Sequence, residues 1–135
     1  TTLANLLSTN LQRPLKKGSY NIKNKEQWSL KALKIHDVIL DRIPLIDEIV
    51  YSRAMDQFST ITLTENHLHL LRNSTIIYIN LSTDIIVERL HERGDEFLEQ
   101  SGIDIESFIE RLKIEYYTFF KNYNIKPIIL GGKDE

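Results

Sequence analysis

The stretch TIIYINLSTDIIVERLHERG, residues 75–94, contains the clearest strand in the chain and the helix that follows it. Its first seven residues are predicted to form that strand. Ser82 or Thr83 then caps the helix, and Asp84 in the first turn interacts favourably with the helix dipole. The helix is predicted to end at Gly94, because glycine readily adopts the backbone conformation of a helix C-terminus.

On both sides of this stretch, segments with helical periodicity alternate with short apolar runs that are typical of strands. Helices are predicted over residues 1–11, 24–34, 45–57, 65–72, 83–93 and 104–123, and further strands over residues 36–41 and 126–130. A basic loop with room for a short strand is predicted before residue 24, and residues 59–63 stay ambiguous. Alternating strands and helices predict an α/β fold in three layers, with one parallel sheet between two layers of helices. We find no linker, so residues 1–135 are predicted to form a single domain.

The composition bounds the function. The chain has 135 residues, of which 41% are hydrophobic and 27% charged, as is ordinary for a soluble globular domain. A net charge of −2 gives no overall basic field, so nucleic acid and membrane are not predicted as partners. The absence of cysteine excludes disulfides and thiolate metal sites, and suits a reducing compartment such as the cytoplasm. No apolar run approaches the roughly 20 residues that a membrane span needs.

The segment ILDRIPLIDEIVY, residues 39–51, places an acidic and a basic residue at the carboxyl end of a predicted strand. Open α/β sheets bind their ligands at this edge. Arg42 offers a planar donor fork to a phosphate or a nucleoside hydroxyl. Asp41 can accept a hydrogen bond from a sugar hydroxyl, orient Arg42, or hold a water on Mg²⁺. The structural alternative is an ion pair that only closes the turn.

This segment resembles the Asp-Arg segment of the thymidylate kinase and deoxynucleoside kinase group of P-loop kinases. In that group the arginine contacts the phosphoryl acceptor, and a Ser/Glu and Tyr cluster farther on lines the nucleoside pocket. The resemblance implies that Arg42 and Asp41 are catalytic. It also implies that Arg42, Glu48 and Tyr51 bind the substrate.

Two further segments are similar to the same family. Residues 78–95 resemble its fourth strand and the helix that approaches the lid, which ends in R-x-x-x-R-G. Arg89 and Arg93 are four residues apart and share one helix face, so the resemblance implies that both contact the ATP phosphates and that Arg93 is catalytic. The alternative is a solvated charged helix. The spacing Phe-x-x-Arg-x-x-x-x-Tyr in residues 108–116 is similar to the helix after the lid.

The sequence TTLANLLSTNL, residues 1–11, fits the stretch that follows the Gly-Lys pair of a Walker A loop. On this resemblance Thr1 is the Mg²⁺ ligand, and Thr1 and Thr2 contact ATP. The glycines of the loop and the family's first strand are not in the sequence, so we expect the native polypeptide to begin before Thr1. The buried stripe of this first helix is predicted to be Leu3, Leu6, Leu7 and Leu11.

The resemblance implies ATP-dependent phosphorylation of a deoxynucleoside or a (deoxy)nucleoside monophosphate, with ATP and Mg²⁺ as cofactors. The catalytic glutamate of deoxynucleoside kinases has no match, because the context of Glu26 differs, and this favours a monophosphate as the acceptor. Arg42 and Arg93 are predicted to share a cleft with the amino end of the first helix. A non-catalytic binding or regulatory relative and a P-loop kinase for another small molecule remain alternatives, and homodimer formation is left open.

Overall fold

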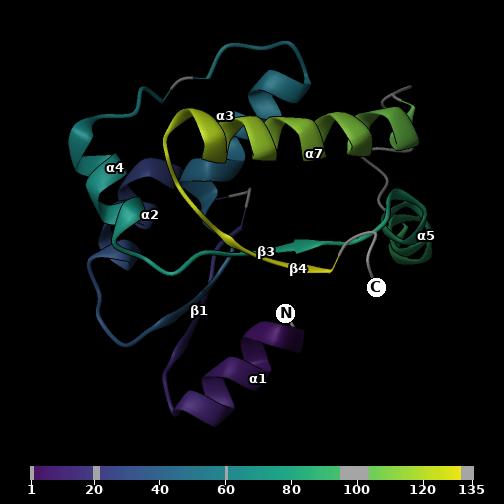
Figure 1. The fold of residues 1–135 in the computed structure, drawn as a ribbon. Helices are drawn as coiled ribbons and strands as arrows, with labels where there is room; N and C mark the ends of the chain where they lie inside the picture. The colour runs from purple at the N-terminus through teal and green to yellow at the C-terminus, as the bar shows by residue number, and fades with distance from the viewer. Residues whose placement is uncertain (1, 20–21, 60, 95–103, 132–135) are drawn as a thin grey trace. The chain divides into compact units, whose positions relative to one another are not determined.

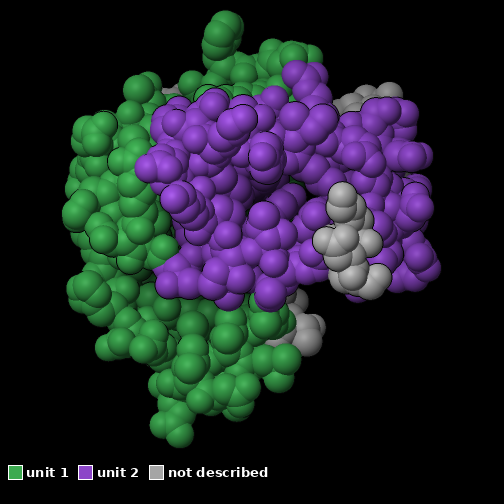
Figure 2. Space-filling model, in the orientation of Figure 1, with its two compact units in different colours: residues 1–74 green, residues 75–135 purple. Residues whose placement is uncertain are grey.

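The computed structural model describes residues 2–19, 22–59, 61–94 and 104–131. The chain forms two compact units, which consist of residues 1–74 and residues 75–135 (Figure 2). Each unit has its own pair of strands and its own helices.

Unit 1 contains one two-stranded sheet. Its elements, in chain order, are α1 (Thr2–Leu11), β1 (Leu15–Lys17), α2 (Lys25–Leu33), β2 (Ile39–Asp41), α3 (Pro44–Ala54) and α4 (Glu65–Arg72) (Figure 1). β1 and β2 pair in parallel, with Leu15 opposite Ile39 and Lys17 opposite Asp41. Both strands therefore end at the same edge of the sheet. In the chain, α3 begins shortly after the end of β2.

The core of unit 1 is centred on α3. Leu45 and Val50 of this helix are 0% exposed. α2 contributes the buried Ala32, and α4 contributes the buried Leu68 and Leu71. α2 packs against both α3 and α4. The sheet edge is thus followed by a rigid, buried helix.

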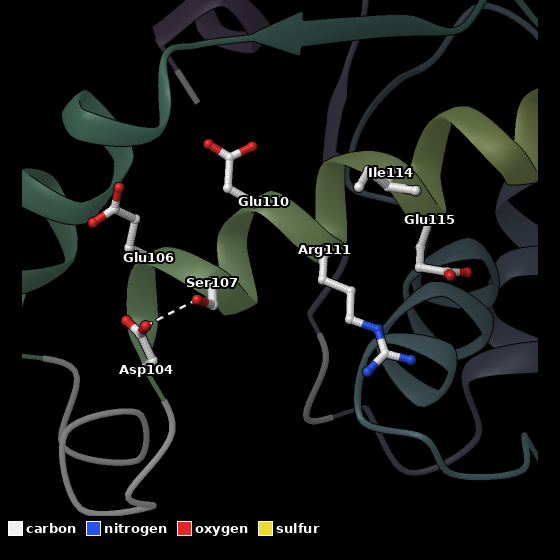
Figure 3. Close-up of a pocket in the computed structure, with 7 residues that line it drawn as sticks. All are labelled: Asp104, Glu106, Ser107, Glu110, Arg111, Ile114 and Glu115. Atoms are coloured by element: carbon white, nitrogen blue, oxygen red, sulfur yellow. Dashed lines mark hydrogen bonds between the residues drawn. The ribbon is translucent and has the colours of Figure 1, made fainter.

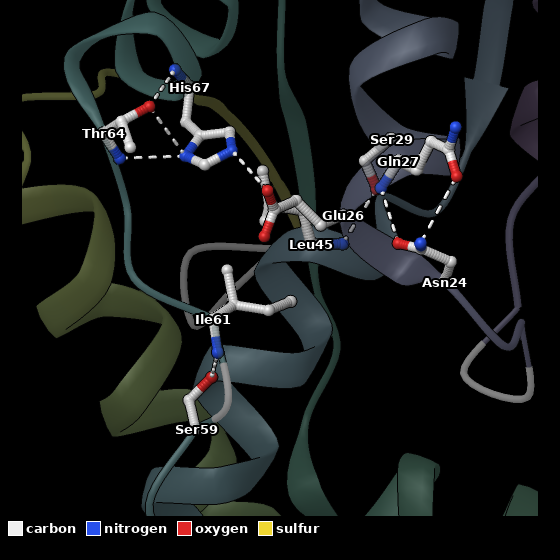
Figure 4. Close-up of polar contacts among 9 residues, drawn as sticks. All are labelled: Asn24, Glu26, Gln27, Ser29, Leu45, Ser59, Ile61, Thr64 and His67. Atoms are coloured by element: carbon white, nitrogen blue, oxygen red, sulfur yellow. Dashed lines mark hydrogen bonds and ion pairs between the residues drawn. The ribbon is translucent and has the colours of Figure 1, made fainter.

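A hydroxyl group from α2 completes the first turn of α3. The N-cap residue of α3, Ile43, has no side chain that can accept a hydrogen bond, so the first amides of the helix need another partner. The Oγ of Ser29 accepts the backbone N–H of Leu45 at 3.0 Å, and Ser29 is 0% exposed (Figure 4). α2 therefore fixes the start of α3.

α4 begins with a capping box that contains a histidine. The Oγ1 of Thr64 accepts the backbone N–H of His67 at 3.3 Å, and the Nδ1 of His67 accepts the backbone N–H of Thr64 at 2.8 Å (Figure 4). The Nε2 of the same ring lies 3.5 Å from the Oε1 of Glu26 on α2. His67 is 3% exposed, so it joins the start of α4 to α2 inside the unit.

Unit 2 contains the second sheet. Its elements are β3 (Ile77–Asn80), α5 (Thr83–Arg93), α7 (Ile105–Asn122) and β4 (Ile128–Gly131) (Figure 1). β3 and β4 pair in parallel over their whole length. α5 begins at the N-cap Ser82 and ends at Gly94, whose φ is 65°. The Oγ1 of Thr83 donates to the Oε1 of Glu110 at 2.6 Å and joins α5 to α7.

α7 supplies most of the core of unit 2. The apolar face of this helix is buried at Phe108, Ile109, Leu112, Phe119 and Phe120. Tyr78 of β3 packs against the rings of Tyr116 and Phe120, with centroids 5.6 and 6.0 Å apart. Burial raises the pKa of the Tyr78 hydroxyl above its ordinary value.

The prediction of one three-layer parallel sheet is wrong. The strands predicted at residues 36–41 and 75–81 do not belong to one sheet, because each lies in a separate two-stranded sheet. β2 pairs instead with β1, which lies in the segment predicted to be a loop with room for a short strand. The apolar pattern locates a strand, but pairing partners are chosen by contacts between distant residues, which the local pattern does not contain.

The buried stripe predicted for the first helix is also wrong in part. Leu6 and Leu11 of α1 are 56% and 51% exposed. Leu3 and Leu7 are half-buried, on a helix that packs against β1 and β2. Across the described ranges of the chain, no helix combines the length and the apolar character that crossing a membrane requires.

Candidate functional site

The carboxyl edge of the β1–β2 sheet gathers several charged side chains in unit 1. Lys17 lies opposite Asp41 at the last pair of the ladder. Past the strand, the backbone N–H of Gly18 donates to the carbonyl oxygen of Asp41 at 2.7 Å and extends the pairing by one residue. Lys16, Lys17 and Arg42 are exposed there. Exposed cations at the ends of the two strands make this edge locally attractive to an anion, although the whole chain is slightly acidic.

Gly18 allows the two strand ends to approach each other closely. A Cβ atom at this position would lie 2.8 Å from the backbone oxygen of Arg42 and 2.8 Å from the Cδ of Pro44. Both distances are below normal van der Waals contact, and one neighbour is backbone, so a side chain would push the edge apart. The glycine is therefore required by the close packing of the site itself.

Arg42 occupies an unusual backbone conformation. Its φ is 75°, in the left-handed region that β-carbon sterics disfavour. The other non-glycine residues of this kind in the described ranges are Gln12, Asp37, Asp56 and Asn124. Three of these four are Asp or Asn, the types that tolerate the conformation best. Such strain costs roughly 1–3 kcal/mol and tends to occur at binding sites, so it marks Arg42 as a functional candidate.

Glu48, predicted to bind the substrate, forms an ion pair with a residue that the sequence did not indicate. The Nζ of Lys25 lies 3.5 Å from the Oε2 of Glu48, and the two side chains are 19% and 15% exposed. Lys25 is the first residue of α2, and Glu48 lies on α3. The only sequence signal for Lys25 was its place at the start of a predicted helix, which is common for exposed lysines.

The predicted substrate-side residues of unit 1 lie on β2, on the turn after it and on α3. Tyr51 lies three residues after Glu48 on α3, so the two share a helix face, and Tyr51 is half-buried. Asp41, also half-buried, ends β2, and Arg42 follows it. Asp41, Arg42, Glu48 and Tyr51 thus lie on one continuous strand–turn–helix segment.

The residues predicted to contact phosphate belong to other elements of the chain. Arg89 is exposed on α5 of unit 2. Arg93 ends α5, and Thr2 begins α1, but their side chains lie outside what the structure describes, as does the whole of Thr1. The predicted cleft shared by Arg42, Arg93 and the amino end of the first helix therefore stays a prediction. Among the described residues, no cluster of three or more His, Asp or Glu side chains could hold a metal ion.

A shallow hollow of about 710 Å³ runs along α7 in unit 2. It is lined by Asp104, Glu106, Ser107, Glu110, Arg111, Ile114 and Glu115. Figure 3 shows these side chains along α7, with Glu110 pointing up and Arg111 pointing down in the view. Four carboxylates against one guanidinium repel an anion, so this hollow does not suit a phosphate group. The edge of the β1–β2 sheet is the better candidate.

Comparisons with known proteins identify a relative of the chain. No family model matches the chain. The SPbeta prophage-derived uncharacterized protein YorR of Bacillus subtilis (strain 168) is 31% identical over 122 residues, which are 82% of this chain and 70% of that protein. The crystal structure of the YorR protein from Bacillus subtilis, in complex with phosphorylated GDP, matches 96% of this chain and 77% of that chain. It does so with a TM-score of 0.65 and 25% identity.

Proposed function

The chain belongs to the YorR family, and we propose that it binds a nucleoside or nucleotide at the carboxyl edge of the β1–β2 sheet and phosphorylates it. The observation that carries this proposal is the strained, exposed Arg42 beside Gly18 and Lys17. The phosphorylated GDP in the YorR structure supports a nucleotide ligand.

Arg42 suits the phosphoryl acceptor or the transferring group. Its guanidinium can donate two parallel hydrogen bonds to phosphate oxygens. Contacts of the neighbouring residues stabilise its strained backbone conformation. The Ser29–Leu45 hydrogen bond and the close packing of Gly18 hold the backbone on both sides of it. These contacts fix the backbone from which the Arg42 side chain extends at the edge of the sheet.

ATP with Mg²⁺ is the proposed phosphoryl donor. In this proposal Thr1 binds the metal, Thr1 and Thr2 contact the donor, and Arg89 and Arg93 offset the phosphate charge. Asp41 orients Arg42 or accepts a hydrogen bond from the sugar. Phosphoryl transfer of this type depends mainly on positioning and charge stabilisation, which a set of arginines at fixed places supplies. This assignment rests on the resemblance of the sequence to thymidylate and deoxynucleoside kinases.

The test is a binding and activity panel. Calorimetry would measure affinity for GMP, GDP and dTMP, and a coupled assay with ATP and Mg²⁺ would measure phosphoryl transfer to the same compounds and to thymidine and deoxycytidine. We expect Arg42→Lys, which keeps the charge but loses the planar fork, to lower transfer at least about tenfold, or about 1.4 kcal/mol of transition-state stabilisation.

The matched control is Arg13→Lys. Arg13 forms an exposed ion pair with Asp37 in the same unit, at 3.4 Å, and the substitution should leave binding and transfer unchanged. If the protein binds none of the nucleotides, the proposal is wrong. If it binds them tightly but transfers no phosphate with any of them, the protein is a non-catalytic nucleotide-binding member of the family.

A further inference from the structure

We propose that Lys25 and Glu48 together read the base of the bound nucleotide and select bases in which a carbonyl group neighbours a ring N–H. This class comprises guanine, hypoxanthine, thymine and uracil. The inference rests on the proposed function, because it needs a nucleotide at the edge of the β1–β2 sheet. It goes further by naming the class of base and the pair of residues that selects it.

The position of the pair suits a base rather than a phosphate. Glu48 lies four residues after Pro44, about 6 Å along the axis of α3 from the turn that carries Arg42. Polar contacts join α2 to α3 at two successive places: Ser29 meets Leu45 at the start of α3, and Lys25 meets Glu48 one turn later. A nucleotide whose phosphate lies at Arg42 can therefore extend its base along α3 toward the pair.

The geometry of the pair is poor for a purely structural clamp. The Nζ and Oε2 atoms are 3.5 Å apart, whereas a charge-assisted hydrogen bond is usually about 2.7–2.9 Å long. The two groups are largely removed from water, and the desolvation of such charges offsets most of their attraction, so an apolar pair would hold two helices equally well. Both side chains nevertheless keep some exposure, at 19% and 15%, through which a ligand can reach them.

The chemistry of the pair selects one arrangement of donors and acceptors. An ammonium group can only donate hydrogen bonds, and a carboxylate can only accept them. Side by side, they complement a base edge that presents a carbonyl oxygen next to a ring N–H. Adenine and cytosine present an amino group next to an unprotonated ring nitrogen, which is the reverse order. The wrong base would place its amino group against the ammonium group and its bare ring nitrogen against the carboxylate, so that donor faces donor and acceptor faces acceptor, and it would bind less well.

A charge exchange tests this assignment. The double variant Lys25→Glu/Glu48→Lys keeps an ion pair between α2 and α3 but exchanges the positions of donor and acceptor. Affinities for GMP, dTMP, AMP and dCMP would be measured by calorimetry in the wild-type protein and the variant. We expect the wild-type protein to prefer GMP or dTMP over AMP and dCMP by at least about tenfold, and the exchange to abolish or reverse that preference.

Further variants keep the test decisive. Glu48→Gln retains the shape of the side chain but can donate as well as accept, so it should weaken the preference even if the double variant fails to fold. The exchange Arg13→Asp/Asp37→Arg, at an exposed pair of the same unit, is the matched control. It should leave the base preference unchanged, although an arginine at position 37, where φ is 61°, lowers the stability of the fold. A wild-type protein that binds nucleotides without preference for these bases, or a preference that survives Glu48→Gln, overturns the inference while leaving the proposed function intact. A wild-type protein that binds no nucleotide overturns both.

Discussion

The hydroxyl oxygen of Ser29 on α2 accepts the backbone N–H of Leu45 on α3 at 3.0 Å, inside the core of unit 1. This hydrogen bond replaces the N-cap that Ile43 cannot provide. It therefore joins the helix that carries Lys25 to the helix that begins directly after the Arg42 turn. The arrangement of the candidate site therefore depends on the buried Ser29–Leu45 hydrogen bond, which involves none of the charged residues of the site.

Ser29→Ala should destabilise the protein. It removes the acceptor for a fully buried N–H, and an unsatisfied buried donor costs about 1–3 kcal/mol. We expect the free energy of unfolding, measured by urea denaturation, to fall by that amount. Ser107→Ala is the control, because the Ser107 hydroxyl bonds Asp104 at 2.8 Å on an exposed surface and its loss should change stability by no more than about 0.5 kcal/mol. Equal effects of the two substitutions would contradict the capping role of Ser29.

Gly18→Ala should damage the site and Gly94→Ala should not. At Gly18 the added methyl group meets backbone at 2.8 Å, and such overpacking costs about 1–3 kcal/mol and displaces the Arg42 turn. At Gly94 no atom lies within 4 Å of the added methyl group, so alanine loses stability only through the φ of 65°. This backbone strain costs about 1–2 kcal/mol of folding free energy. Both variants should melt at lower temperature, but only Gly18→Ala should weaken nucleotide affinity. Unchanged affinity in Gly18→Ala would show that the close approach of the strand ends is not needed for binding.

Arg42→Gly should separate stability from function. Glycine adopts a φ of 75° without strain, although it gains freedom in the unfolded chain, so the two effects nearly offset. We expect the free energy of unfolding to stay the same or to rise by up to about 1 kcal/mol, while nucleotide binding is lost. Asn124→Gly, at a φ of 54° in unit 2, controls for the backbone effect and should preserve binding. A clear loss of stability in Arg42→Gly would mean that the guanidinium serves the fold.

Tyr78 should make the stability of unit 2 sensitive to alkaline pH. Desolvation raises the pKa of this phenol in the folded state, so the unfolded chain loses its proton first as the pH rises. The stability contribution is complete below the ordinary pKa of tyrosine, 10.0, and is lost as the pH rises through the higher folded value. Tyr78→Phe should flatten this part of the stability curve, measured by denaturation between neutral and alkaline pH. Tyr117→Phe, at a side chain that is 64% exposed, should leave the curve as it is.

The sequence located the elements better than their partners. The helix predicted at residues 65–72 matches α4, and the helix at 104–123 matches α7 to within one residue at each end. Periodicity and capping residues are local features of the sequence, so they locate a helix without any knowledge of tertiary contacts. The three-residue strand β1 has almost no local signal, because Leu15 is followed by two lysines. Its pairing with β2 therefore could not be predicted from the sequence. The strand at residues 36–41 was instead expected to join the other predicted strands in a single sheet.

The candidate site was foreseen in part. The acidic and basic residues after β2 stand out in the sequence, and the structure places Arg42 in a strained turn at the end of that strand. Lys25 and Gly18 were not recognised, because their roles depend on contacts with residues that lie more than 20 positions farther along the chain. A lysine at a helix start and a glycine in a basic loop have many ordinary explanations, and only the folded chain distinguishes among them.

The two parallel strand pairs also differ in how far the chain must travel to form them. Leu15 pairs with Ile39, 24 positions later, whereas Ile77 pairs with Ile128, 51 positions later. Closing a loop of twice the length costs only about 0.6 kcal/mol more in chain entropy, but non-local pairing slows folding. The sheet that carries the Arg42 turn should consequently assemble before the sheet of unit 2. A newly made chain would then have a formed β1–β2 edge with its Arg42 turn while the strands of unit 2 are still unpaired.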